Sequence, residues 1–306
     1  MSSRALVVVL VSALGPGLGG CVSVEEPVIA GDEAGELVVS PVTPGYAPLV
    51  LSLTFDDGHA EHVQAAAWLA GMPSTFYVSS GRLGEPGGLT AADLDRIAAG
   101  GHEIGAHTRN HVHLPALAGD AALAEMCDDR DALSALGHVV STLAYPFGDD
   151  SAAVRELARV CGFDGARDVG GLRNVDPWAG NAGYCGTTAS SASRPAAERL
   201  PPTDAFAIRS RASIRSTCTH DDLRHMVLAA ASDATDVAIR EPRWLVLNFH
   251  RVCSDCPDDA YAVTPTRLRQ LAIWLRARQG VIPVLDASGR VIARRPLVFS
   301  TVASAL

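Results

Sequence analysis

Two short polar segments carry the residue types that metal-dependent hydrolysis needs. Asp56 and Asp57 close one apolar run of the chain, and His107 and His111 follow another. The two histidines are four residues apart, a spacing that places them on one face of a helical turn, so both imidazoles can reach one ion. One aspartate can complete a ligand set of two histidines and one carboxylate, and the other remains beside the metal as a base. Such a set turns a bound water into a nucleophile near neutral pH.

The segments around these residues predict alternating strands and helices. The apolar run 49–55 predicts a buried parallel strand, and the run 102–106 predicts a strand that delivers His107 at its end. The pattern predicts further strands over 74–79, 139–144, 163–166, 244–249 and 281–285, and helices over 61–70, 90–99, 120–136, 150–161, 220–231 and 264–278. Polar residues follow many of the strands, which favours an α/β fold with a parallel barrel over a doubly wound sheet. The segment 168–235 does not continue the alternation of strands and helices, and we expect it to be a long loop beside the substrate.

Composition excludes two classes of function. The net charge of −9 argues against a nucleic-acid partner held through its phosphates. All 25 basic residues are arginines, so lysine nucleophiles and Schiff-base chemistry are excluded.

The N-terminus predicts export. Residues 1–20 combine Arg4 with a short apolar stretch, and Leu18–Cys21 resembles the bacterial lipoprotein cleavage motif, in which the cysteine receives the lipid. We therefore expect lipidation at Cys21, a tether over 21–46, and anchoring to the membrane at the bacterial cell envelope. A plain signal peptide with secretion is the alternative.

Six further cysteines are expected to form three disulfides, because an even number in an oxidising compartment favours that state. Pairing in sequence order predicts Cys127–Cys161, Cys185–Cys218 and Cys253–Cys256. A zinc site formed by His250 with the last two cysteines, or a redox pair, is the alternative for the Cys-x-x-Cys segment.

Four motifs in order resemble those of the NodB-homology polysaccharide deacetylases, carbohydrate esterase family 4. They are Thr54–Gly58, His107–His111, Ala144–Gly148 and Leu247–His250, and the resemblance covers about 48–286. It implies a distorted (β/α) barrel and a divalent metal, usually Zn²⁺. It also implies removal of acetyl groups from amino sugars or, less often, from sugar esters.

The resemblance also implies roles for individual residues. The metal ligands would be Asp57, His107 and His111. Asp56 would be the general base and His250 the general acid. The backbone N–H of Tyr145 would help to stabilise the oxyanion.

Two positions depart from the family pattern. The third motif usually begins with an arginine that orients the base, but this chain has Ala144 there, and Arg167 could supply the guanidinium from a neighbouring strand end. The fourth motif is only partly visible as Asp176 followed by Trp178, and Asp168 is a competing carboxylate for tuning the general acid. The residues expected around the substrate are Pro146, Phe147, Arg167 and Trp178.

The sequence therefore predicts one catalytic domain over 47–290, with a tail over 291–306, that removes N-acetyl groups from amino-sugar polysaccharide of the envelope or environment. We expect it to act as a monomer. Acetyl esters of the acetyl-xylan type or a small linear amide are alternative substrates. A non-haem iron oxygenase would leave Asp56 and His250 without a role. A catalytically impaired glycan-binding module is favoured only by Ala144.

Overall fold

The computed structural model describes residues 41–306 except 192, 234–239 and 257–258. The chain divides into two units, Met1–Val39 and Ser40–Leu306, and the first lies wholly outside the described residues. The predicted signal segment, Cys21 and most of the predicted tether lie outside them too. Within the described part, no helix has the length and hydropathy that crossing a membrane requires.

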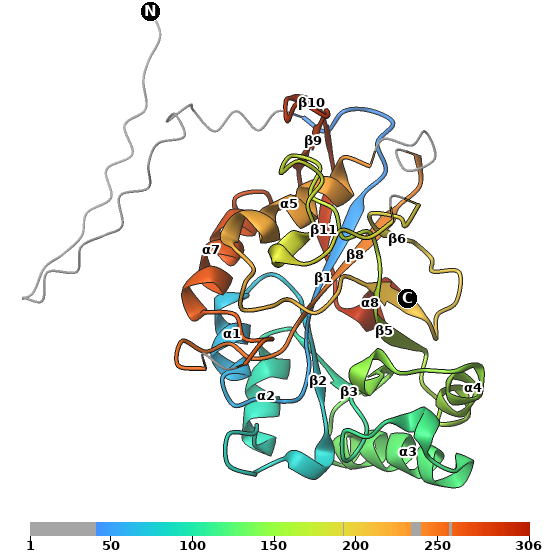
Figure 1. Ribbon diagram of the computed structural model, residues 1–306. Coiled ribbons are helices and arrows are strands. Elements are labelled where there is room, and N and C mark those ends of the chain that lie inside the picture. The colour runs from blue at the N-terminus through green and yellow to red at the C-terminus, as the bar shows by residue number, and fades with distance from the viewer. Residues whose placement is uncertain (1–40, 192, 234–239, 257–258) are drawn as a thin grey trace, which may run out of the picture. The chain divides into compact units, whose positions relative to one another are not determined.

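A mostly parallel sheet forms the framework of the second unit (Figure 1). Its parallel strands run in the order β8-β1-β2-β3-β4-β5-β7, and the short β6 (Glu198–Arg199) pairs antiparallel with β8. Their bounds are β1 (Leu49–Phe55), β2 (Thr75–Val78), β3 (Glu103–Ala106), β4 (Thr142–Ala144), β5 (Gly165–Gly171), β7 (Ile208–Ser210) and β8 (Arg243–Phe249). Just past β7, the backbone N–H of Arg211 donates to the carbonyl of Val246 at 2.9 Å, so the sheet nearly closes on β8. The predicted barrel is confirmed, and the doubly wound alternative is wrong.

Helices follow the strands on the outside of the sheet (Figure 1). They are α1 (His62–Trp68), α2 (Ala91–Ala99), α3 (Gly119–Ala135), α4 (Ala152–Val160), α5 (His220–Ala231) and α7 (Pro265–Arg276). The short α8 (Val302–Ala305) instead packs against inward-facing residues of the strands. Two of these helices, α2 and α7, begin at the residues that the sequence predicts. Thr90 and Asp93 form a reciprocal capping box at α2, and Thr264 caps α7 ahead of Pro265.

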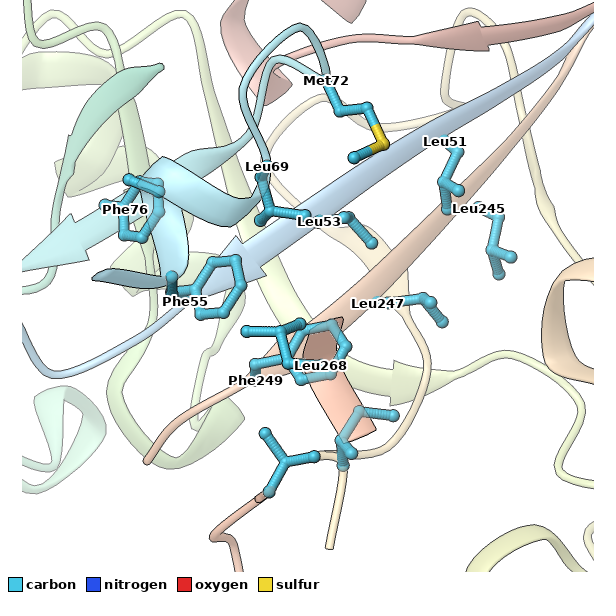
Figure 2. Close-up of a cluster of buried hydrophobic side chains, with 14 of the residues drawn as sticks. Leu51, Leu53, Phe55, Leu69, Met72, Phe76, Leu245, Leu247, Phe249 and Leu268 are labelled. Atoms are coloured by element: carbon cyan, nitrogen blue, oxygen red, sulfur yellow. The ribbon is translucent and has the colours of Figure 1, made fainter. Parts of the chain in front are cut away.

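Alternation along the strands separates two packing layers. Leu53 and Phe55 of β1 and Leu247 of β8 point outward into the large cluster beneath the helices (Figure 2). The residues between them point inward, where Val50 and Trp244 belong to a second cluster that fills the barrel. Because side chains alternate with a period of two, every second residue continues this inward direction. Asp56, His107 and His250 continue this inward direction one residue past β1, β3 and β8, and Arg167 has it within β5.

The described part of the structure has three disulfides, and the predicted pairing is confirmed at Cys127–Cys161, Cys185–Cys218 and Cys253–Cys256. The first joins α3 to the end of α4. The second one staples the segment 168–235, as predicted. That segment is more regular than expected, since β5 runs on to Gly171 and both β6 and β7 lie within it.

The C-terminal part differs from the sequence-based expectation. The strand β9 (Ile282–Leu285) pairs antiparallel with β10 (Val291–Arg295) in a separate two-stranded sheet. The expected tail over 291–306 is instead part of the domain, because β11 (Leu297–Phe299) pairs parallel with β1. Leu297 and Val302 are buried, and the gain from removing their apolar surface from water explains why this segment packs. The domain boundary predicted at 290 is therefore wrong.

We expect Val302→Ala to lower the free energy of unfolding by about 2 kcal/mol, because Val302 is fully buried among residues that fill the barrel. The matched control is Val298→Ala, since Val298 is 45% exposed and its truncation should change stability by less than about 0.5 kcal/mol. Urea unfolding with the disulfides intact measures both. Equal effects would contradict the assignment of the C-terminal segment to the core.

Candidate metal centre and catalytic pocket

Asp56 and Asp57 leave β1 in different ways. Asp56 keeps the inward phase of the strand, and its backbone N–H donates to the carbonyl of Phe249 at 2.9 Å. Asp57 would point outward by alternation, but its backbone is left-handed with a φ of 75°. Aspartate tolerates this conformation better than most residues. The break in alternation lets both carboxylates line the same pocket.

His107 and His111 reach this pocket from a loop rather than a helical turn. The backbone of Thr108 and His111 is left-handed, with φ values of 60° and 54°, so the predicted helical face is wrong. His107 comes directly from the inward phase of β3. Its backbone N–H donates to Asp129 of α3 at 2.9 Å, and its Nδ1 donates to the carbonyl of Ala144 at 2.7 Å. A carbonyl can only accept, so this bond fixes the tautomer and leaves Nε2 to face Asp57.

Three side chains converge on one point. Oδ1 of Asp57 lies 3.4 Å from Nε2 of His107 and 3.1 Å from Nε2 of His111. The three ligand atoms lie within 4.8 Å of one another. Oδ1 of Asp57 is buried and has no partner with hydrogen-bond geometry among the described residues, which fits a carboxylate oxygen aimed at a cation. The residues present therefore fit a divalent metal with two nitrogen ligands and one oxygen ligand.

A third histidine, His59, also approaches this carboxylate. Its Nε2 lies 3.6 Å from Oδ2 of Asp57. Burial raises the pKa of Asp57, but the surrounding imidazoles of His107, His111 and His59 outweigh burial and hold the pKa well below its ordinary value. The carboxylate is therefore charged across the range in which an enzyme works. His59 was not among the predicted site residues, although it lies only two residues after Asp57 in the sequence.

Asp56 is held by Arg167. Nη2 of Arg167 lies 2.5 Å from Oδ1 and 2.6 Å from Oδ2 of Asp56, and both side chains are buried. Arg167 and Ala144 are register partners on the adjacent strands β5 and β4. The guanidinium thus comes from the strand beside the position where the family has its arginine, as we hypothesised. With no exposed surface, Arg167 cannot touch a bound glycan, so its expected place among the substrate contacts is wrong.

The pKa of Asp56 reflects two opposing effects. Burial raises the pKa, but the positive charge of Arg167 outweighs it, with smaller help from His107 and His250, and the net direction is down. Asp56 is therefore an ionised carboxylate that can accept a proton.

His250 faces Asp56 from the end of β8, with its Nε2 3.9 Å from Oδ2. Burial lowers the pKa of His250 below its ordinary value. Among the described residues, neither Asp168 nor Asp176 contacts it. Asp168 accepts the backbone N–H of Val169, and Asp176 pairs with Nδ1 of His225 at 2.7 Å. Both predicted candidates for tuning His250 are therefore wrong.

Tyr145 does not offer the predicted oxyanion contact. Its backbone N–H donates to the carbonyl of Arg167 at 3.1 Å, and its hydroxyl donates to the carbonyl of Phe206 at 3.1 Å. Both groups are thus used within the fold. Pro146 is buried as well, whereas Phe147 is 56% exposed and stacks on His113 with 3.8 Å between ring centroids. Phe147 lines the pocket and can serve as a wall for the substrate.

The pocket has a volume of about 400 Å³ and gathers most of the predicted site residues. Asp56, Asp57, His107, His111, Phe147 and His250 line it, together with Val169, Ser213 and Tyr261, which the sequence analysis did not single out. Trp178 lies elsewhere, in a cavity of about 490 Å³ where its Nε1 donates to the carbonyl of Asp286 at 3.1 Å. Its predicted contact with a sugar in the catalytic pocket is therefore wrong.

Comparison with known proteins places part of this chain. Residues 46–166 match the family model described as polysaccharide deacetylase. YxkH of Bacillus subtilis (strain 168), named as a polysaccharide deacetylase, is 27% identical over 115 residues, which cover 36% of this chain and 41% of YxkH.

Two solved structures give a weaker likeness. The Streptococcus pyogenes deacetylase PplD in complex with acetate is 25% identical, with a TM-score of 0.38 over 39% of this chain and 56% of PplD. A family 4 carbohydrate esterase from Streptomyces lividans is 15% identical, with a TM-score of 0.41 over 82% and 98% of the two chains. At these TM-scores the likeness supports no conclusion about activity.

The chain spans 41% of the length of YxkH and 56% of that of PplD, so the matches concern a part of these relatives. The matched part holds β1 to β4 together with Asp56, Asp57, His107 and His111. Residues 46–166 are thus similar to the polysaccharide deacetylases over the segment that carries these four residues.

Proposed function

We propose that this protein is a metal-dependent hydrolase that removes N-acetyl groups from an amino-sugar polysaccharide. The observation that carries the proposal is the convergence of two sets of side chains in one open pocket. The first set is Asp56 with His250, an ionised carboxylate facing an imidazole. The second set is the cluster of Asp57, His107 and His111 beside it. The similarity of residues 46–166 to the polysaccharide deacetylases supports the choice of reaction.

Asp57, His107 and His111 would hold the metal, and Zn²⁺ suits their nitrogen and oxygen atoms. When bound, such a metal supplies positive charge that polarises the acetyl carbonyl and makes water more acidic. The hydrogen bond from Nδ1 of His107 to Ala144 keeps that imidazole oriented for the ligand role.

The remaining side chains move protons. Asp56 accepts the proton of the attacking water, and Arg167 keeps this carboxylate ionised and oriented. His250 donates a proton to the leaving nitrogen, which an amine needs before it can depart. The lowered pKa of His250 makes its protonated form a stronger acid than a histidine in water.

Two of the alternatives lose their support. The binding-module hypothesis depended on Ala144, and the contact between Arg167 and Asp56 restores the missing guanidinium. In a non-haem iron oxygenase, Asp56 and His250 would have no role in the reaction. We also propose, from the signal-like N-terminus, that the protein acts at the cell envelope through a lipid on Cys21. The three disulfides support an oxidising compartment.

The ligand assignment predicts that His107→Ala and His111→Ala each reduce bound metal to well below one equivalent after dialysis, because each removes one of three protein ligands. The control is His220→Ala, which removes a histidine from the start of α5, outside the pocket. Metal content by mass spectrometry, with circular dichroism to check folding, measures the effect. Full retention of metal in both pocket variants would contradict the assignment.

Asp56→Asn and His250→Ala should each lower kcat by about 10²–10⁴-fold, because each removes a proton carrier. Acetate released from N-acetylglucosamine oligomers measures kcat, and acetylated xylan is the comparison substrate. Asp95→Asn, which removes a carboxylate that is 72% exposed, should leave kcat unchanged. Acetate release from acetylated xylan but not from N-acetylglucosamine oligomers would contradict the amide reaction and support the ester alternative.

Arg167→Gln should shift the acidic limb of the rate profile to higher pH. Without the guanidinium, burial of Asp56 is no longer opposed, its pKa rises, and the base is protonated over a wider range. Arg173→Gln is the control, because Arg173 pairs with Asp233 outside the pocket. Adding Ala144→Arg to Arg167→Ala should recover part of the rate, since the two positions are register partners. An unmoved acidic limb in Arg167→Gln would exclude the positioning role.

A further inference from the structure

The ring of His250 is not oriented by hydrogen bonds of its own. Its Nδ1 is buried without a hydrogen-bond partner among the described residues, and its Nε2 lies 3.9 Å from Oδ2 of Asp56, beyond hydrogen-bond range. A histidine that delivers a proton to one atom of a substrate needs a fixed position. The backbone of His250 and the side chains packed on its ring therefore have to supply that position.

His62, the first residue of α1, holds the backbone of His250. Nε2 of His62 lies 2.7 Å from the carbonyl oxygen of His250, although the two residues are 188 positions apart in the sequence. Because a carbonyl can only accept, His62 is the donor and carries a proton on Nε2. Burial lowers the pKa of His62 to about 4, so the ring is a neutral donor in the range where an enzyme works.

The rest of the environment of His62 is apolar. The residue has no exposed surface, and its ring centroid lies 5.5 Å from that of Phe55 and 5.8 Å from that of Phe76. Both phenylalanines belong to the buried cluster beneath the helices (Figure 2). Burying an imidazole among such rings is costly unless it is hydrogen-bonded. The bond to the carbonyl of His250 therefore accounts for a histidine at this position, where an apolar side chain would otherwise cost less.

The neighbouring residues make a second link between α1 and the end of β8. Arg251 follows His250, and its Nε donates to the carboxylate of Glu61, which precedes His62. Two consecutive residues of one segment thus bind two consecutive residues of the other. This double contact fixes the direction in which the chain leaves β8.

The ring of His250 is held separately from its backbone. It packs against Tyr261, with 5.3 Å between the ring centroids and 33° between the ring planes. The backbone N–H of Val263 donates to the carbonyl of Arg251 at 2.9 Å, which brings this part of the chain back beside His250. The backbone is therefore positioned by His62 and the ring by Tyr261.

We propose that His62 is a positioning residue for His250, and that its hydrogen bond to the His250 carbonyl holds the imidazole where it can protonate the leaving nitrogen. The proposal rests on the deacetylase function proposed above and adds a buried residue that does not touch the substrate. A displacement of about 1 Å in a catalytic group can lower a rate by about 10²-fold. Loss of this bond should therefore slow the release of groups that must be protonated and spare the release of groups that need no proton.

The test compares two leaving groups. N-acetylglucosamine oligomers release an amine, which must be protonated, whereas para-nitrophenyl acetate releases a phenolate that departs without a proton donor. In His62→Phe, which fills the space without a donor, kcat on the oligomers should fall by about 10–100-fold, with KM changed by less than about threefold. The rate on para-nitrophenyl acetate should change by less than about threefold. His62→Gln, whose side-chain amide can donate, should recover most of the lost rate on the oligomers.

The matched control is His102→Phe. His102 is also buried, its Nε2 lies 3.1 Å from the carbonyl oxygen of Ala66 in α1, and its ring lies 5.5 Å from that of Phe76. This variant removes a buried imidazole and a hydrogen bond to the same helix, but its hydrogen bond does not reach the end of β8. It should lower stability while leaving the ratio of the two rates unchanged.

Three results would overturn the proposal. Equal losses on both substrates in His62→Phe would show a general loss of structure, and unchanged rates on both would show that the bond has no role. A change in the rate ratio as large in His102→Phe as in His62→Phe would remove the link to His250. If circular dichroism shows that His62→Phe does not fold, His62→Met, which also lacks a donor, is judged by the same criteria.

A spectroscopic measurement separates this proposal from the proposed function. In nuclear magnetic resonance spectra of protein with isotope-labelled histidine, the Nε2 proton of His62 should exchange slowly with water, because it is buried in a hydrogen bond. In His62→Phe the ring signals of His250 should shift or broaden, while those of His220 in α5 stay unchanged. This result would support the role of His62 even if no acetate is released. Acetate release together with unmoved His250 signals would retain the deacetylase and overturn the role of His62.

Discussion

The ion pair between Asp56 and Arg167 is the interaction on which the site depends. The two residues come from β1 and β5, which lie four strands apart in the sheet, so the guanidinium spans the interior of the barrel. It also lies 5.1 Å from the ring centroid of Tyr77. Arg167 is fully buried and Asp56 is 1% exposed, at the floor of the pocket, so each charge is tolerated only because the other is present. The same ion pair therefore orients the proposed base and neutralises the charges buried inside the barrel.

Backbone conformation around the pocket shows where the chain departs from regular structure. Asp57, Thr108, His111 and Phe147 all have a positive φ, in the left-handed region that non-glycine residues seldom adopt. Such residues cost on the order of 1–3 kcal/mol each and persist only when their surroundings hold them. Asp129 is one such restraint, since its carboxylate accepts backbone N–H groups from both Ser80 and His107. The rigid part of the pocket is thus held from α3, outside the barrel.

Much of this arrangement could be predicted from sequence because it follows strand periodicity. Asp56, His107 and His250 end inward phases of strands, and Arg167 was predictable because adjacent parallel strands end at the same edge. The failures lie where alternation stops. The backbone of His111 is set by a loop conformation that spacing does not reveal, and the N–H of Tyr145 is taken by a sheet that continues one residue further than expected. Trp178 belongs to a long segment whose path depends on tertiary contacts.

The pairing of β1 has a consequence for how the chain reaches its native state. Its partners β8 and β11 follow it by nearly the whole length of the domain, as the register of Leu49 with Arg243 and with Leu297 shows. A nascent chain that lacks these last segments leaves both sides of the first half of β1 unpaired and its apolar side chains uncovered. Contacts between residues so far apart in the sequence form slowly, and the apolar surface of β1 is exposed to aggregation until they form. Pairing of β1 on both sides must therefore wait until β11 has been synthesised, nearly 250 residues after β1 begins.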